Sequence, residues 1–369
     1  MKHRINVVLL AIVFSPFVLT AQVRAEKDYE RTFFAPEDAR VEVISKYGEV
    51  IVQTWELDSI RFKILVKAEG KNSSTIRKSM DKVDVRFRKV GSMISAVTQV
   101  SSGNGFLSNI MNEVEGVVGS NNKLEVNYEV WVPENVDLSV ENKFGDVFLA
   151  DLKGRVNLNV SHGDIKASHI DQELVLTHSF GKSSFATLSD GSVTLRGVDM
   201  KIEKARRLDF ESGSSEIFID EADDVRFNSR NDEILISRVK DLSSRGSFTD
   251  LSVKYLERSA SLNFSYGDIH FSQIDQDFSL MEITGKSTDI DLVLNQASFI
   301  KANIKGPEDR MILPNSMLLM NKEQLDEGII KLTGEVGNTN TRYGQLTIEA
   351  EKGELIIAIK KTPIFTDRD

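Results

Sequence analysis

Hydrophobic and polar residues alternate with a period of two along most of the chain, as they do in strands that bury one face. Clear examples are the runs 41–44, 83–87, 124–130, 156–160 and 346–350. Helical spacing of apolar residues occurs at two places: residues 73–82, where Ser74 is a candidate N-cap, and residues 106–118, within an insertion at 101–122. The pattern predicts an all-β protein with short helical decorations.

The predicted strands belong to a repeated sequence. Residues 161–176 (SHGDIKASHIDQELVL) and 265–280 (SYGDIHFSQIDQDFSL) are identical at nine of sixteen positions. The likeness continues beyond them, because a Gly-Lys-Ser tripeptide follows each copy at the same distance, beginning at Gly181 and Gly285. Shorter copies recur at near-constant intervals, so one unit of roughly 17–21 residues tiles the region from about 140 to 300.

Units this short cannot bury an apolar face alone and have to stack on one another. Two short strands and two turns per unit predict a parallel β-solenoid, specifically a right-handed β-helix, with strands about 4.8 Å apart. We expect the glycine of each copy, such as Gly163, to supply a positive φ at the turn, and the acidic residue after it to bond turn amides. One apolar residue per copy would form an internal column: Val147, Ile165, Ile217, Ile234, Leu251 and Ile269.

The less regular segments beside the repeats are candidates for caps, because the last unit of a solenoid leaves strand edges unpaired. The predicted organisation is a signal peptide at 1–25, a β-rich N-terminal region and cap at 26–139, regular repeats at 140–300, and closing strands with a tail at 301–369. We expect Trp55 and Trp131 to pack within the N-terminal region, and the 101–122 insertion to cover the first repeats.

The segment 1–25 has the three parts of a secretory signal peptide. Lys2, His3 and Arg4 precede an apolar run, and Val23-Arg24-Ala25 offers a cleavage site before Glu26. Since the run is interrupted and no basic stop-transfer segment follows, we expect cleavage rather than a membrane anchor. No later segment approaches the length of a transmembrane helix, so the predicted location is the periplasm, or the cell surface and extracellular space.

The net charge and the absence of cysteine limit the kinds of partner and chemistry expected of this chain. The chain has 46 Lys and Arg against 56 Asp and Glu, a formal net charge of −10, and would lose three basic residues with the signal peptide. This acidity argues against nucleic acid as a partner, because phosphates are bound by basic surfaces. The chain contains no cysteine, which excludes disulfides, thiol chemistry and a lipid anchor and suits a bacterial envelope.

Several motifs resemble those of bacterial exported proteins known as putative adhesins, which carry β-strand repeats of unknown function. They are Tyr47-Gly48-Glu49-Val50 with Trp55, the strand YEVWVP at 128–133, and ENKFGDV at 141–147 with Gly163-Asp164-Ile165 one repeat later. The resemblance extends over most of the predicted mature chain. It implies export and a parallel β-solenoid, and it supplies no catalytic residues.

The stretch SHGDIKASHID at 161–171 first suggests catalysis or metal binding. His162, however, occupies the slot before the turn glycine, so we expect its ring to pack like the aromatic residues found there in other copies: Tyr47, Phe144, Phe180, Tyr266 and Tyr343. His169 aligns with Gln273, an exchange typical of solvent-exposed positions. No metal-ligand spacing such as HExxH occurs, and the sequence predicts neither a metal site nor a cofactor.

Acidic residues recur at one turn position and are the candidate binding residues: Asp146, Asp164, Glu233, Asp250 and Asp268. Stacking would line their carboxylates along one edge, where they could contact sugars or a cation. Neighbouring carboxylates repel one another, and the dense nonapeptide of calcium-binding repeats is absent. Good turn chemistry is therefore an alternative explanation of the Gly-Asp pair.

No repeat gathers unlike chemical groups, so we expect a protein without enzymatic activity. The leading hypothesis is an exported β-solenoid, a putative adhesin or envelope binding protein, that recognises an envelope or extracellular protein or glycan through many weak contacts. Two alternatives remain open. One is a periplasmic accessory protein in envelope maintenance or stress signalling; the other is a polysaccharide-active enzyme on a β-helix, which would use paired carboxylates.

Overall fold

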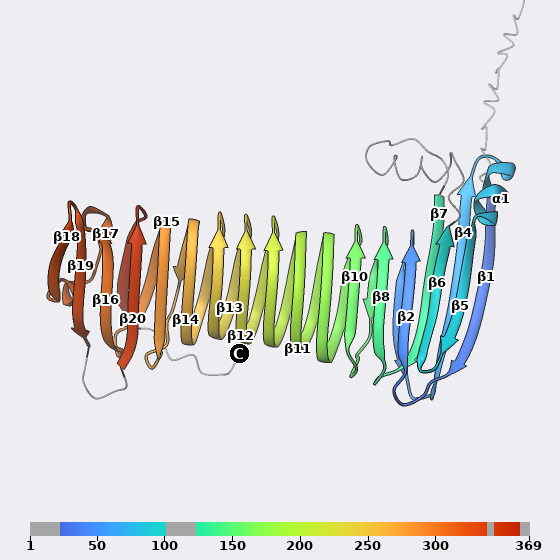
Figure 1. Ribbon diagram of the computed structural model, residues 1–369, viewed down its shortest axis with the longest axis horizontal. Helices are drawn as coiled ribbons and strands as arrows, with labels where there is room; N and C mark the ends of the chain where they lie inside the picture. Colours follow the sequence, from blue (N-terminus) through green and yellow to red (C-terminus); the bar gives the residue numbers. More distant parts are fainter. Residues whose placement is uncertain (1–22, 101–122, 338–342, 362–369) are drawn as a thin grey trace, which may run out of the picture.

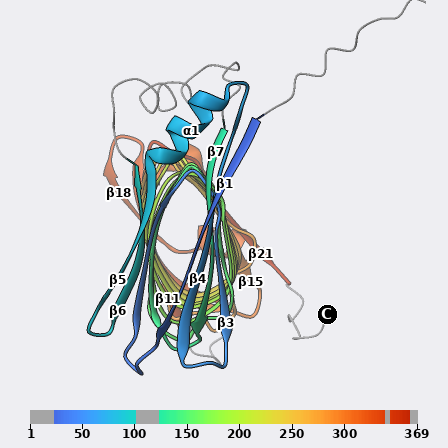
Figure 2. The same ribbon diagram turned by 90° about the vertical axis from the view of Figure 1, so that its right-hand side faces the viewer.

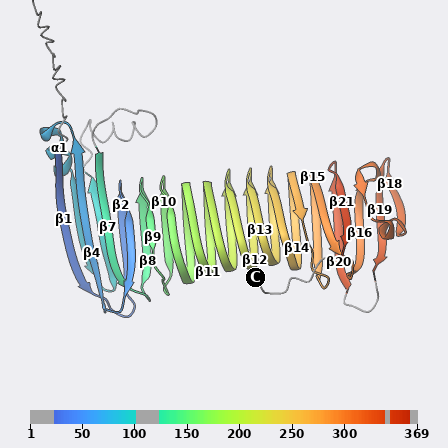
Figure 3. The same cartoon turned by 180° about the vertical axis from the view of Figure 1, so that it is seen from behind.

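The computed structural model describes residues 23–100, 123–337 and 343–361. The chain is mostly β, and its strands form one large sheet in which parallel pairs predominate. The strands lie side by side along the long axis of the molecule, with β1 at one end and β18 at the other (Figure 1). The same order is visible from behind in Figure 3. No helix among the described residues is long and apolar enough to cross a membrane.

The elements follow the chain in three groups. The first contains β1 (Val23–Phe34), β2 (Arg40–Lys46), β3 (Val50–Trp55), β4 (Ser59–Gly70), α1 (Ser73–Asp81), β5 (Val83–Val90), β6 (Met93–Val100) and β7 (Lys123–Pro133). The second contains β8 (Asp137–Lys143), β9 (Val147–Leu149), β10 (Val156–Ser161), β11 (Ile165–Gly213), β12 (Glu216–Arg230), β13 (Glu233–Ser247), β14 (Asp250–Phe271) and β15 (Leu280–Asn295). The third contains β16 (Phe299–Pro307), η1 (Glu308–Arg310), β17 (Met311–Ile312), α3 (Asn315–Leu318), β18 (Asn321–Asp326), β19 (Ile329–Val336), β20 (Tyr343–Glu351) and β21 (Leu355–Lys360).

The parallel register hardly changes through the second group. Ile217 of β12 pairs with Ile234 of β13, and Ile234 pairs with Leu251 of β14, so the step along the chain is the same both times. Ile165 of β11 pairs with Val147 of β9 at a step only slightly longer. Each repeat therefore lies on the one before it, and each residue faces its counterpart in the neighbouring repeats.

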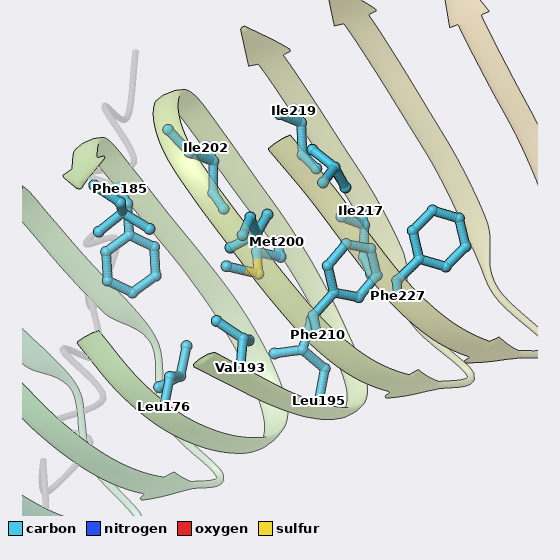
Figure 4. Packing of buried hydrophobic residues seen from close by; sticks show 14 of the residues in the cluster. Leu176, Phe185, Val193, Leu195, Met200, Ile202, Phe210, Ile217, Ile219 and Phe227 are labelled. Atoms are coloured by element: carbon cyan, nitrogen blue, oxygen red, sulfur yellow. The ribbon is translucent and has the colours of Figure 1, made fainter. Parts of the chain in front are cut away.

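Viewed along the long axis, the strand segments superpose into an oval outline with two long sides (Figure 2). We call these sides face A, which contains β9 and the segments in line with it such as 216–219, and face B, which contains β8, β10 and segments such as 225–230. The core lies between them, where the rings of Phe210 and Phe227 stack at 4.8 Å (Figure 4). The predicted internal column on face A is confirmed, since all six of its members are at most 3% exposed: Val147, Ile165, Ile217, Ile234, Leu251 and Ile269.

Antiparallel strands occupy both ends of the array. β1 pairs with β4 and β4 with β7 at one end, and β16, β19 and β18 form an antiparallel series at the other. β2 and β3 are early in the sequence, yet they lie in parallel between β6 and β8 and between β7 and β9. Trp55 and Trp131 stack at 6.3 Å in this region, in line with the expected packing. The antiparallel strands cover edges that the parallel array would otherwise expose.

The helix expected at residues 73–82 is confirmed as α1, which buries Ile76 and Met80. The predicted cap was wrong: the side chain of Asn72 accepts the amide hydrogen of Ser74 at 2.9 Å, so Asn72 is the N-cap and Ser74 lies within the helix. The second expected helix, in the 101–122 insertion, lies outside the described residues. The predicted signal peptide also lies outside them up to residue 22.

The turn that leads from face B to face A has a different conformation from the one expected. The positive φ belongs to the residue before the glycine, with values of 61° at Phe144 and 55° at His162. The prediction that the glycine supplies the positive φ was therefore wrong at Gly163. At Gly267, the counterpart of Gly163 in the second copy, the glycine does have a positive φ, of 132°, and Tyr266 before it has one of 59°. The lack of a side chain at Gly163 matters for another reason, since a Cβ on Gly163 would lie 2.1 Å from the carbonyl oxygen of Gly145 in the adjacent repeat.

In the middle of the array, the glycine position of the turn holds larger residues. Asp232 occupies it in β12–β13 and is only 5% exposed. Its carboxylate accepts hydrogen bonds from the amide of Ser215 at 2.7 Å and from the hydroxyls of Ser212 and Ser229 at 2.6 and 2.5 Å. Here a buried carboxylate links neighbouring repeats, where elsewhere the backbones approach directly.

We expect Asp232→Ala to lower the free energy of unfolding by at least about 2 kcal/mol, because it leaves a buried amide and two hydroxyls without their acceptor. Urea denaturation followed by circular dichroism measures the change. Glu233→Ala is the matched control: this adjacent side chain is exposed, and its loss should change the free energy by less than about 0.5 kcal/mol. Equal effects of the two substitutions would contradict the role given to Asp232.

Candidate functional site

The five candidate acidic residues lie in one row on face A, immediately after the turn. The register pairs Glu233 with Asp250. The amide of Asp164 bonds the carboxylate of Asp146, and the amide of Asp268 bonds that of Asp250, each in the adjacent repeat. We call this line of side chains the acidic row.

The acidic row has further members that the sequence motif did not reveal. They are Asp199, Glu216 and Asp289. Asp199 pairs in register with Glu216, Glu216 pairs with Glu233, and Asp289 pairs with Asp268. Each follows a residue other than glycine, so a search for Gly-Asp pairs misses them, whereas counting forward from Asp164 one repeat at a time finds Asp199 and Glu216. Lys182 interrupts the row and pairs with Asp199 at 3.1 Å.

Several carboxylates of the row have a structural role. Asp164 Oδ1 accepts the amide hydrogen of Lys182 at 2.8 Å, Asp250 Oδ1 accepts that of Asp268 at 3.1 Å, and Asp289 Oδ1 accepts that of Glu354 at 2.8 Å. Each bond links one repeat to the next. This agrees with the expected bonding of turn amides, except that the amide belongs to the neighbouring repeat.

The stacking of like charges affects the protonation of Asp268. Its partial burial, together with the carboxylates of Asp250 and Asp289, holds the pKa of Asp268 above its ordinary value of 3.8. Within the described residues, no group of three or more His, Cys, Asp or Glu side chains is placed to hold a metal ion. The row is thus a series of separate carboxylates that repel one another.

We expect Asp268→Asn to raise the melting temperature at pH 7, because it removes a disfavoured charge. A raised pKa in the folded state means that Asp268 binds more protons in the native than in the unfolded chain just above pH 3.8, so its contribution to wild-type stability falls as the pH rises through that range. The advantage of the variant should therefore shrink as the pH falls towards 3.8. Thermal denaturation between pH 3 and 8 measures it, with Asp38→Asn in an exposed turn as the control. A gain of the same size at every pH would refute the explanation.

The four histidines among the described residues do not converge on one site. His162 lies between the rings of Phe144 and Phe180, at centroid distances of 5.1 and 5.0 Å, as expected for an aromatic slot. His169 pairs with Asp151, and His270 pairs with Asp291. These contacts are local and structural.

His178 is fully buried, and its Nε2 donates a hydrogen bond to the carbonyl oxygen of Gly163 at 2.8 Å. Asn142 occupies the corresponding inward position two repeats earlier, where its amide donates to the carbonyls of Gly48 and Gly145 at 2.9 and 2.8 Å. Burial lowers the pKa of His178 below its ordinary value of 6.5, so the ring is neutral at pH 7. The side chains of Asn142 and His178 both donate hydrogen bonds to turn carbonyl groups that point into the core.

We expect His178→Ala to cost about 1–3 kcal/mol in the free energy of unfolding, because it leaves the buried carbonyl of Gly163 without a donor. His178→Asn should cost less, since Asn142 performs the same task in the same column. The lowered pKa also makes wild-type stability decline as the pH falls below 6.5, where the unfolded chain takes up a proton first. Denaturation at pH 5.5 and 7.5 should show that decline in the wild type and a smaller one in His178→Asn; equal declines would contradict it.

A hollow of about 600 Å³ lies on face A along the acidic row. Three of the predicted candidates line it, namely Asp146, Asp164 and Glu233, whereas Asp250 and Asp268 do not. The apolar residues Phe148, Phe218 and Leu235 also line it; they are half-buried and lie two positions beyond the row. Lys166, Lys182 and Lys201 line it too, so carboxylates, lysines and apolar side chains share this hollow.

A second hollow of about 750 Å³ lies on face B. The outward positions of successive repeats line it, in two parallel rows along β11 to β15. The outward side chains that line it are all polar, the buried Val193, Phe210, Phe227 and Leu262 border it from the core, and it includes none of the five candidates. No sequence motif marks this surface, because its residues differ from repeat to repeat.

Solved structures of low sequence identity are similar to this one. A "putative adhesin" from Parabacteroides merdae is 9% identical, with 72% of this chain and 95% of that chain covered and a TM-score of 0.33. A "putative adhesin" from Bacteroides fragilis is 11% identical, with 90% and 97% covered and a TM-score of 0.31. A "putative lipid binding protein" from Parabacteroides distasonis is 13% identical, with 71% and 96% covered and a TM-score of 0.35.

The resemblance to putative adhesins that the sequence motifs indicated thus has counterparts among solved structures. No family model and no curated protein matches the sequence. At these identities and TM-scores, the likeness assigns neither a ligand nor an activity to this chain.

Proposed function

We propose that this protein is an exported, non-enzymatic β-solenoid that binds a partner in the bacterial envelope or outside the cell. The near-constant step along the chain between parallel partners supports the solenoid. We assign it the right-handed form, because connections between parallel strands of one sheet are nearly always right-handed.

The observation that carries the function is the assembly of the face A hollow from the same two outward positions in successive repeats. Its acidic residues run from Asp146 to Glu233, and each comes from a different repeat. A partner lying along this face would touch several repeats at once, and its weak contacts would add. The array is suited to holding an extended surface rather than enclosing a small substrate.

The chemistry of the hollow favours a protein partner with basic side chains next to apolar ones. Phe148, Phe218 and Leu235 offer apolar area, and the five carboxylates of the acidic row that line the hollow outnumber its three lysines, which leaves negative charge beside the apolar side chains. Glu216 and Glu233 matter most, since within the part of the chain that the structure describes their carboxylates make no ion pair or hydrogen bond. Two charges with no structural role are available to a partner.

The bonds of the other carboxylates support the absence of catalysis. Asp164 and Asp250 each use an oxygen to accept a backbone amide, which is a fixed structural role. An acid-base pair would instead need two carboxyl groups facing a substrate from different environments. The purified chain can be incubated with a panel of polysaccharides. Degradation of any of them by the wild type, but not by Asp164→Asn, would overturn this part of the proposal.

We expect the double substitution Glu216→Gln and Glu233→Gln to weaken binding to isolated envelopes by at least about tenfold at low salt, because it removes charge complementarity. Binding of the purified chain is measured by cosedimentation. Glu37→Gln, an exposed acidic residue in a turn of the N-terminal region, is the matched control. Equal binding by the double variant and the control would exclude the acidic row as the contact surface.

Protease treatment of intact cells decides between the leading proposal and its main alternative. An adhesin should be degraded in intact cells. Protection that ends only when the outer membrane is opened would favour the periplasmic accessory role.

A further inference from the structure

The face B hollow differs in chemistry from the acidic row and has its own geometry. One of its rows runs Arg226, Ser243, Ser261, Glu282, each paired in register with the next. The two short serines lie between two long side chains. This difference in length accounts for a depression in an otherwise regular face.

The second row of the hollow presents amide and guanidinium groups. Asn228 pairs in register with Arg245, and Arg245 pairs with Asn263, so three donors from three successive repeats point outward side by side. Among the described residues, the guanidinium of Arg245 has no ion-pair or hydrogen-bond partner. A guanidinium that the protein leaves unpaired in a lined hollow has its donors free for a ligand.

The hollow also contains acceptors, so its charges nearly balance. Asp209, Glu211 and Glu282 line it together with Arg226 and Arg245. A strongly anionic polymer would meet the carboxylates, and a strongly cationic one would meet the arginines. A ligand rich in hydroxyl groups, which both donate and accept hydrogen bonds, fits this mixture of groups best.

Two aromatic rings lie beyond the hollow in the same repeats. Phe248 and Tyr266 are three positions further along the strands from Arg245 and Asn263, which is about 10 Å at the usual rise per residue. Their rings stack at 4.8 Å, and they are 55% and 46% exposed. Exposed rings of this kind can pack against the apolar C–H face of a sugar, while the polar rows bond its hydroxyls.

We propose that the face B hollow binds a neutral polysaccharide, with the sugar chain lying along the long axis of the array. The polar pairs recur at the strand spacing of about 4.8 Å, which is close to the length of one pyranose unit in an extended chain. Successive sugars would therefore meet equivalent positions of successive repeats. This site is separate from the acidic row on face A and does not depend on the protein partner proposed there.

The test is affinity gel electrophoresis of the purified chain in gels containing hydroxyethylcellulose, mixed-linkage β-glucan, dextran or galactan, with alginate as the anionic comparison. We expect at least one neutral polysaccharide to retard the chain, and Arg245→Ala and Asn263→Ala each to weaken that binding by about tenfold or more. Asn159→Ala is the matched control: Asn159 is an exposed asparagine of face B in β10, in the same row as Asn263 but outside the hollow.

The proposal would be overturned if alginate alone retarded the chain, or if no neutral polysaccharide did. It would also be overturned if Asn159→Ala and Asn263→Ala were retarded equally. All three altered side chains are exposed, so unchanged melting temperatures should show that the variants are folded. The envelope-binding experiment separates the two proposals. If the wild-type chain binds envelopes but no neutral polysaccharide retards it, the glycan site is rejected and the face A proposal stands. If a neutral polysaccharide retards the chain but the chain does not bind envelopes, the face A proposal is rejected and the glycan site stands.

Discussion

The close contact between successive turns sets the geometry of the whole array. Gly163 lies so near the carbonyl of Gly145 that a side chain at this position would overlap it. Beside this contact, the amide of Phe144 bonds the carbonyl of Ser161, and the amide of His162 bonds that of Ser179, each at 2.9 Å. With the register fixed at one turn, the alternation of period two places the same position of every repeat on the same side of the sheet. The core columns and the outward rows both follow from it.

The turn changes in the middle of the array, and so do the faces. Gly197, Ser214 and Asn231 replace the stacked aromatic residues of earlier repeats, and larger residues such as Asp232 replace the glycine. The buried carboxylate of Asp232 then takes over the linkage between repeats. Both hollows include these same repeats, because Glu216 and Glu233 line one and Asn228 lines the other. The repeats whose turns are held by side chains therefore contribute to both hollows.

The repeat period allowed much of this structure to be predicted, because in a parallel array the period in sequence equals the step between paired strands. The buried column from Val147 to Ile269 and the alignment of the acidic residues follow directly from it. The residue with positive φ could not be predicted in the same way. Glycine tolerates that conformation more readily than Phe144 or His162, and only the distance between neighbouring backbones shows why glycine is needed one position later.

Two other features also escaped prediction from sequence. The insertion of β2 and β3 between β6–β7 and β8–β9 depends on pairings between segments far apart in the chain, which no local pattern records. The face B hollow depends on differences in side-chain length, such as Ser243 beside Arg226, rather than on a repeated motif. The N-cap is Asn72 rather than Ser74, because the side chain of Asn72 accepts the amide hydrogen of Ser74, two positions ahead.

The two faces differ in how often an outward side chain accepts a hydrogen bond from a backbone amide of the next repeat. The first outward position of face A follows the turn, where a short acidic side chain such as Asp164 accepts the amide of the next repeat. Acidic residues at this position would therefore recur even without a partner, and only members that accept no amide, such as Glu216 and Glu233, point to binding. On face B, Asp137 accepts the amide of Arg155 in the same way, whereas the described side chains that line the face B hollow accept no backbone amide. The side chains there, such as Ser243, Arg245 and Asn263, are therefore not set by the contact between backbones, and the binding proposed for that face is argued from their own hydrogen-bonding groups.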